Sequence, residues 1–99
     1  MSNPIEGGKE YEDITWAFQG RHVPEEVTDE LARARSKFKP FNSAHEGYAV
    51  ILEELDELWD VVKLRHDSPE RTAKMREEAI QVAAMAMRVI IDVCDRRKA

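Results

Sequence analysis

The residues with the clearest chemical potential are carboxylates that stand where a helix needs apolar side chains. Along residues 44–65 the apolar positions recur with helical spacing, and Glu54 falls inside their arc with Glu57 at its edge. Further on, Glu78 falls in the middle of the apolar stripe that continues through residues 79–94. A buried carboxylate without a partner is costly, so each must be neutral, paired with a cation or bound to a metal.

Simpler interpretations remain open for several charged residues. An alternative interpretation of Glu78 is that it lies near the start of a helix and forms an ion pair with Arg71 or Lys74. The i,i+4 spacing of Arg88 and Asp92 predicts that they form an ordinary ion pair. The rest are expected to be structural, with Asp56, Asp60 and Lys63 on a solvated face and Trp59 in the core.

Two long helices are expected to position these carboxylates. The Ser-x-x-Glu pattern at residues 43–46 has the form of a capping box and predicts a helix over 44–65. Ser68 as the N-cap, followed by Pro69 at the first helical position, predicts a second helix over 69–95. Only a short break separates them, which favours a helical hairpin.

The break also predicts which side chains face one another. If the chain folds back between residues 67 and 68, Glu57 lies opposite Glu78, and Glu54 lies opposite Gln81. Oxygen ligands without His or Cys suit a hard cation such as Mg²⁺ or Mn²⁺ rather than zinc. The spacing therefore predicts a metal site between the two helices.

The remaining chain predicts one small all-α domain. Residues 1–23 form an N-terminal arm, and residues 24–99 form a single helical bundle domain that begins with a helix over 24–38. A chain of 99 residues is marginal alone, and residues 79–94 are apolar nearly all round. We therefore expect a bundle built on a long antiparallel hairpin and completed as a homodimer or a dimer of dimers.

Composition excludes several function classes. A net charge of −5 argues against polymeric nucleic acid as a partner, since such surfaces carry a clustered basic excess. No apolar run approaches the roughly 20 residues of a membrane span. One cysteine, Cys94, and a polar start without a signal-peptide core predict a cytoplasmic protein.

A family resemblance rests on the same carboxylates. EELDE at residues 53–57, followed by EAIQ at 78–81, resembles the EExxE…ExxD signature of the MazG-like all-α nucleoside triphosphate pyrophosphohydrolases. The resemblance covers about residues 37–95. It implies a Mg²⁺-dependent enzyme that cleaves a nucleoside triphosphate between the α- and β-phosphates. The closing Asp of the signature is Gln81 here, which brings an oxygen but no charge.

The resemblance also implies roles for individual residues. Glu54, Glu57 and Glu78 would hold Mg²⁺, with Gln81 assisting. Glu53 would hold a second ion or orient the attacking water. Candidate substrate-binding residues are the cations Arg65, Arg71 and Lys74 for phosphate, each equally explained as a surface charge, and Trp16, Asn42 and His45 for the base.

Three functions compete at this point. The first is a Mg²⁺-dependent nucleotide pyrophosphohydrolase that acts on ribo- or deoxyribonucleoside triphosphates. The second is a catalytically weakened relative that binds nucleotides or a protein partner, which Gln81 would explain. The third is a plain helical oligomerisation module, which alone predicts no metal site.

Overall fold

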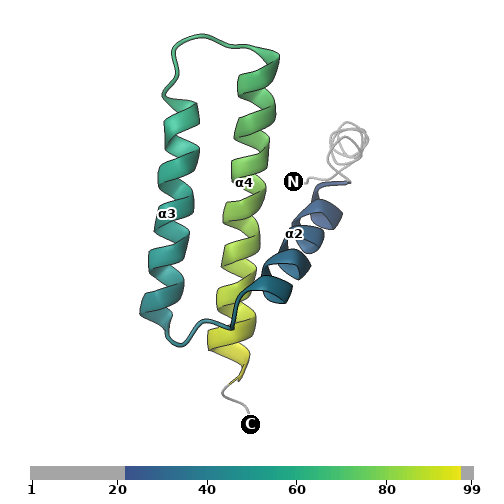
Figure 1. Ribbon diagram of the computed structural model, residues 1–99, viewed down its shortest axis with the longest axis vertical. Coiled ribbons are helices and arrows are strands. Elements are labelled where there is room, and N and C mark those ends of the chain that lie inside the picture. The colour runs from purple at the N-terminus through teal and green to yellow at the C-terminus, as the bar shows by residue number, and fades with distance from the viewer. Residues whose placement is uncertain (1–21, 97–99) are drawn as a thin grey trace, which may run out of the picture.

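A computed structural model describes residues 22–96 of the protein, and this part of the chain forms three α-helices. The helices are α2 (Val23–Lys37), α3 (Ala44–Val62) and α4 (Pro69–Val89), and α4 continues into a π-helical segment, η1 (Ile90–Asp95). α3 and α4 lie side by side in opposite directions, and α2 packs obliquely against α4 (Figure 1). Within the described range no strand is present, which confirms the prediction of an all-α fold.

The helix starts follow the predicted capping residues. The Ser43 hydroxyl accepts the backbone N–H of Glu46 at 3.1 Å, and the Ser68 hydroxyl accepts that of Arg71 at 3.0 Å. One detail differs from a capping box, because the Glu46 carboxylate accepts the backbone N–H of Asn42 at 2.6 Å. Both caps satisfy donors that the first turn of a helix leaves without partners.

The α3 helix ends at Val62, earlier than the predicted end at Arg65. The Arg71 guanidinium donates to the carbonyl oxygens of Val61 at 3.1 Å and Val62 at 2.7 Å, and it pairs with Asp67 at 2.7 Å. Carbonyl groups in the last turn of a helix need such external donors. Arg71 therefore joins the end of α3 to the start of α4.

The apolar core lies between α2, the α2–α3 loop and the C-terminal half of α4. Six residues form its buried centre, and partly buried side chains of α3, α4 and η1 pack around them. Burial of these groups is the main favourable contribution to folding. The centre consists of Val27, Leu31, Ala34, Phe41, Ala84 and Met85.

Asp92 connects the C-terminal end of the helical chain to α2 and the α2–α3 loop. It is only 3% exposed, and its carboxylate accepts Arg35 Nη1 at 2.7 Å and the backbone N–H of Phe41 at 3.1 Å. Arg88 Nε lies 3.6 Å from the same carboxylate, which confirms the predicted Arg88–Asp92 pair. The pair is buried and shared with two other elements, so its role exceeds that of an exposed i,i+4 pair.

Two arginines fix the same loop through its carbonyl groups. Arg88 donates to the Lys39 carbonyl at 2.9 Å and stacks over the Phe41 ring at 4.0 Å from its centroid. Arg96 donates to the carbonyls of Phe41 at 2.7 Å and Asn42 at 2.6 Å. We call Arg88, Asp92 and Arg96 the anchor trio; together they hold the loop against α4 and η1.

Gly47 marks the closest approach of α3 to its neighbours. A Cβ atom at this position would lie 2.7 Å from Val89 Cγ2 and 3.2 Å from Phe41 Cδ2. Gly47→Ala gains up to about 1 kcal/mol of helix propensity, but overpacking costs about 1–3 kcal/mol. We expect a net loss of about 1 kcal/mol in the free energy of unfolding, measured by urea denaturation. A more stable variant would mean that Val89 moves aside without cost.

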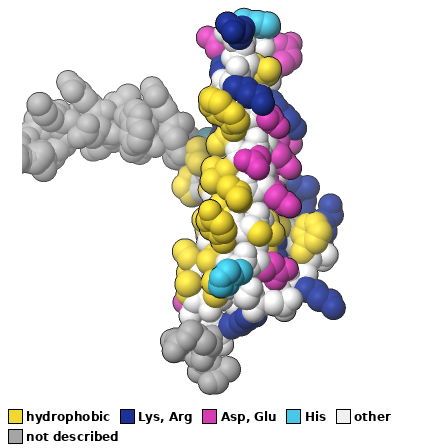
Figure 2. All heavy atoms as spheres, turned by 90° about the vertical axis from the view of Figure 1, so that its left-hand side faces the viewer, with side chains coloured by type: hydrophobic (Ala, Val, Ile, Leu, Met, Phe, Trp, Pro, Cys, Tyr) yellow, Lys and Arg dark blue, Asp and Glu magenta, His cyan; other side chains and the backbone are white. Residues whose placement is uncertain are grey.

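The outer face of α3 carries an exposed apolar stripe. Trp59 is 58% exposed, so the expectation that it lies in the core is wrong, because no described element covers this side of α3. Figure 2 shows apolar side chains gathered along this face beside a column of acidic ones. None of the helices in residues 22–96 combines the length and the hydrophobicity that a membrane span requires. We call the following residues the α3 stripe: Tyr48, Leu52, Leu55, Trp59 and Val62.

Candidate metal centre

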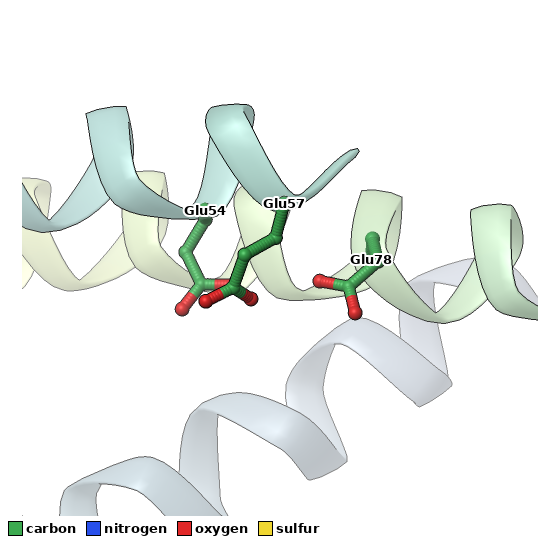
Figure 3. A group of neighbouring side chains, drawn as sticks. All are labelled: Glu54, Glu57 and Glu78. Atoms are coloured by element: carbon green, nitrogen blue, oxygen red, sulfur yellow. The ribbon is translucent and has the colours of Figure 1, made fainter. Parts of the chain in front are cut away.

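Three carboxylates converge between α3 and α4. One oxygen from each of Glu54, Glu57 and Glu78 lies within 4.8 Å of the other two. Figure 3 shows Glu54 and Glu57 descending from α3 and the Glu78 carboxylate turned toward them from α4. The antiparallel register of the two helices brings Glu57 and Glu78 together, and the spacing of one turn adds Glu54.

The cluster contains acceptors with no donor. Glu78 is 5% exposed, yet its Oε1 has no hydrogen-bond partner among the described residues, and the same is true of the buried Glu54 Oε1. Buried polar atoms are nearly always satisfied, so two bare carboxylate oxygens in one cluster need an explanation. A hard cation between the carboxylates would satisfy both, and the donor set therefore fits Mg²⁺ or Mn²⁺.

The carboxylates perturb one another. Burial raises the pKa of Glu54, and the nearby charges of Glu57 and Glu78 raise it further. Desolvation and the adjacent Glu78 carboxylate likewise raise the pKa of Glu57. Such shifts are typical of acidic groups that are held together before a cation neutralises them.

One cation already lies at the cluster. Lys74 Nζ is 3.2 Å from Glu78 Oε2, and this contact raises the pKa of Lys74. The alternative interpretation of Glu78 as an ion-pair partner is thus present in the structure. It involves only one of the two Glu78 oxygens, because Oε1 lacks a partner within the described residues.

A cavity of about 600 Å³ opens beside the cluster. It lies between the C-terminal half of α2, the α2–α3 loop and the facing sides of α3 and α4. Glu54 belongs both to the cluster and to the lining of the cavity, which also includes Glu53 from α3 and Gln81 from α4. Cavities of this size hold drug-sized and nucleotide-sized ligands. Gln81 thus lies close to the predicted position, although its side chain adds no charge.

The predicted substrate-binding residues that the structure describes do not lie together. Asn42 lines the cavity, whereas His45 and Arg65 are exposed and do not. The guanidinium of Arg71 is engaged at the end of α3, so its donors serve the fold. Trp16 lies outside the described residues. Among the members of this set that the structure describes, Asn42 and Lys74 alone lie beside the cavity or the cluster.

Sequence reasoning missed the contribution of α2 and the loop after it. Residues 30, 33, 34 and 37 recur with helical spacing and line the cavity from one face of α2. That periodicity was visible in the sequence, but nothing local indicates which helix this face meets. Glu30 also approaches the cluster, and its charge adds to the raised pKa of Glu54. The missed cavity residues with side chains suited to ligand binding are Glu30, Arg33, Lys37, Phe38 and Lys39.

The arrangement can bind a divalent cation at the edge of a ligand-sized cavity, which is the requirement for metal-assisted chemistry on a bound anion. Comparison of the chain with models of protein families, with curated proteins and with solved structures finds no match. The function is therefore inferred from the residues of the site and from the signature they resemble.

Proposed function

We propose that this protein is a Mg²⁺-dependent nucleotide pyrophosphohydrolase, which converts a ribo- or deoxyribonucleoside triphosphate to the monophosphate and pyrophosphate. The carboxylate cluster carries the proposal, because two of its buried oxygens lack partners in the described chain and it borders a cavity of about 600 Å³. The resemblance of residues 53–57 and 78–81 to the pyrophosphohydrolase signature supplies the reaction. We propose that the protein acts in the cytoplasm, because its single cysteine, Cys94, suits a reducing compartment.

In this mechanism Glu54, Glu57 and Glu78 hold Mg²⁺, and the Gln81 amide oxygen assists. When bound, the ion polarises the phosphate oxygens and neutralises charge that develops on them. Glu53, on the cavity wall beside Glu54, orients the attacking water or contributes to a second ion. Lys74 holds the Glu78 carboxylate in place, because its ammonium lies 3.2 Å from Glu78 Oε2.

The direct test is a screen of all common ribo- and deoxyribonucleoside triphosphates for pyrophosphate release with Mg²⁺ present. We expect at least one substrate to give equal amounts of monophosphate and pyrophosphate, and we expect a chelator to stop the reaction. Release of orthophosphate with a diphosphate product would place the cleavage at the wrong bond. No product from any substrate would also contradict the proposal.

A catalytically weakened relative remains the alternative function, and two observations favour it. The Lys74 ammonium neutralises part of the cluster, and Gln81 replaces the fourth carboxylate of the signature. A protein of this kind would bind Mg²⁺ and nucleotide without releasing pyrophosphate. Titration calorimetry combined with the product screen separates the two functions, and absence of any Mg²⁺ or Mn²⁺ binding would leave only a structural module.

Gln81→Asp tests how the departure from the signature affects the metal. The added carboxylate should tighten Mg²⁺ binding by about tenfold and keep or raise turnover, since each anion near a partly dehydrated cation contributes favourably. Gln81→Asn is the matched control, with the same shortened side chain and no charge. Titration of Mg²⁺ into all three proteins measures the effect. Equal or weaker binding in the Asp variant would remove Gln81 from the metal shell.

We also propose that a second copy of this chain covers the α3 stripe, giving a homodimer or a dimer of dimers. The stripe extends along one face of α3 from Tyr48 to Val62 and is far more contiguous than the single exposed apolar residues of a typical surface. The apolar surface was expected on residues 79–94. The exposed surface lies mainly on α3 instead, since most large side chains of α4 face α2, the loop or α3.

Leu55→Glu in the centre of the α3 stripe is therefore expected to produce monomers. A buried, unpaired charge costs several kcal/mol at such an interface. Multi-angle light scattering at micromolar concentration should show a multiple of 11.4 kDa for the wild type and 11.4 kDa for the variant. Asp56→Ala, on the adjacent solvated face, should leave the mass unchanged. A monomeric wild type would rule out this assembly.

A further inference from the structure

The cavity beside the metal centre is lined by charged side chains of both signs, the acidic ones being Glu30, Glu46, Glu53 and Glu54 and the basic ones Arg33, Lys37, Lys39 and Arg88. Glu53 and Glu54 line it from α3, close to the carboxylate cluster. Arg33 and Lys37 from α2 and Lys39 from the loop line it as well. A ligand that extends from a cation on the carboxylates into this cavity therefore meets positive charge. With a divalent cation on the carboxylates, this distribution fits a polyanion.

The cationic side chains that line the cavity differ in whether they already have a partner within the protein. Arg33 forms an ion pair with Glu30, and Arg88 donates to the Lys39 carbonyl. By contrast, no ion pair between described residues involves Lys37 or Lys39. These two lysines, separated by one residue, are thus the ammonium groups of the cavity that can accept a new anionic partner.

The backbone that carries these lysines is fixed. The Lys39 carbonyl accepts Arg88 Nη2 at 2.9 Å, and two residues later the Phe41 N–H donates to Asp92 at 3.1 Å. Lys37 is the last residue of α2, and the N–H of the following residue, Phe38, closes the helix on the Ala34 carbonyl at 2.9 Å. Only the side chains must be ordered on binding, which lowers the entropic cost.

We propose that Lys37 and Lys39 bind the phosphate groups of the nucleotide across the cavity from the metal centre. The catalytic part of this assignment rests on the proposed function, whereas the binding part requires only a divalent cation and a polyphosphate. The chain of phosphates is held at one end by the cation on Glu54, Glu57 and Glu78 and at the other by the two ammonium groups. Lysine binds phosphate as a point charge, which tolerates different phosphate positions.

Pyrophosphate is the probe that isolates this interaction, because it has two phosphate groups and no base or sugar. Its affinity in the presence of Mg²⁺ is measured by titration calorimetry for the wild type, Lys37→Ala, Lys39→Ala and the double variant. We expect a loss of about tenfold for each single variant and a larger loss for the double variant. Mn²⁺ binding without pyrophosphate should stay unchanged, and circular dichroism should show an intact fold.

Lys63→Ala is the matched control, since it also removes one lysine but lies far from the cavity, at the end of α3 beside Asp60. Its pyrophosphate affinity should equal that of the wild type. If the wild type does not bind pyrophosphate, or if the double variant binds it within twofold of the wild type, the assignment of the lysines is overturned.

Turnover separates this result from the proposed function. Lysine-dependent pyrophosphate binding without hydrolysis of any nucleoside triphosphate would refute the enzyme and leave the phosphate site in place. Hydrolysis with an unchanged KM in the double variant would refute the phosphate site and leave the enzyme in place. We expect the double variant to raise KM at least tenfold, with a smaller effect on kcat.

Discussion

Glu57→Gln and Glu78→Gln are each expected to reduce Mg²⁺-dependent pyrophosphate release by about a hundredfold or more, because each removes a charged ligand from the metal centre. Glutamine keeps the size of the side chain, so a change in packing does not explain the loss. The variants should also bind Mn²⁺ more weakly in a titration that contains no nucleotide. The measurements are initial rates of pyrophosphate release and titration calorimetry.

Without metal, Glu57→Gln should be as stable as the wild type or more stable. The pKa of Glu57 is raised in the folded protein, so the metal-free fold loses stability as the pH rises through the folded pKa. Removing the charge at residue 57 removes that loss at neutral pH. Saturating Mg²⁺ should reverse the order, since a ligand at 100 times its Kd stabilises the wild type by about 2.7 kcal/mol.

Asp56→Asn is the control for both experiments. Asp56 neighbours Glu57 in the chain but is exposed and belongs to no cluster in the described structure. Its activity, metal affinity and thermal midpoint should match those of the wild type. A loss as large as that of Glu57→Gln would mean that the solvated face of α3, rather than the face toward α4, holds the metal.

Asp92→Ala should cause a large loss of stability. The substitution leaves Arg88 buried without its carboxylate and removes the acceptor of Arg35 and of the Phe41 N–H. Breaking a buried pair by removing one partner costs about 3–5 kcal/mol. That value is a large part of the stability of a small domain, and urea denaturation followed by circular dichroism measures it.

Asp95→Ala provides the comparison for Asp92→Ala. Asp95 has the same side chain and lies in the same π-helical segment, but it is exposed. Its effect should be within about 0.5 kcal/mol of zero. If both variants lost little stability, the hydrogen bonds to Asp92 would contribute no more than water does at an exposed carboxylate.

Local signals in the sequence predicted the helices and the carboxylate cluster. Ser43, Ser68 and Pro69 mark helix starts through contacts within one turn, and such contacts are readable from neighbouring residues. The short break between α3 and α4 fixes the register closely enough to bring Glu57 opposite Glu78. In both cases the interacting residues are close in sequence or lie on two helices that a short connection joins.

Long-range packing was not predictable in this way. Trp59 was expected in the core, but burial depends on whether another element covers that face of α3, and none of the described residues does. Arg71 was a candidate for phosphate binding, but its guanidinium donates to the carbonyl oxygens of Val61 and Val62 at the end of α3. The cavity needs α2, whose position is set by contacts such as Arg35–Asp92 that join residues far apart in the chain.

The anchor trio holds the α2–α3 loop by its main chain, through the carbonyls of residues 39, 41 and 42 and the N–H of Phe41. Every amino acid except proline offers these groups, so the anchorage does not depend on the side chains at positions 38, 39 and 42. These positions line the cavity, and they are free to diversify while the scaffold persists. A combinatorial library at these three sites should therefore yield mostly folded proteins with altered ligand preference.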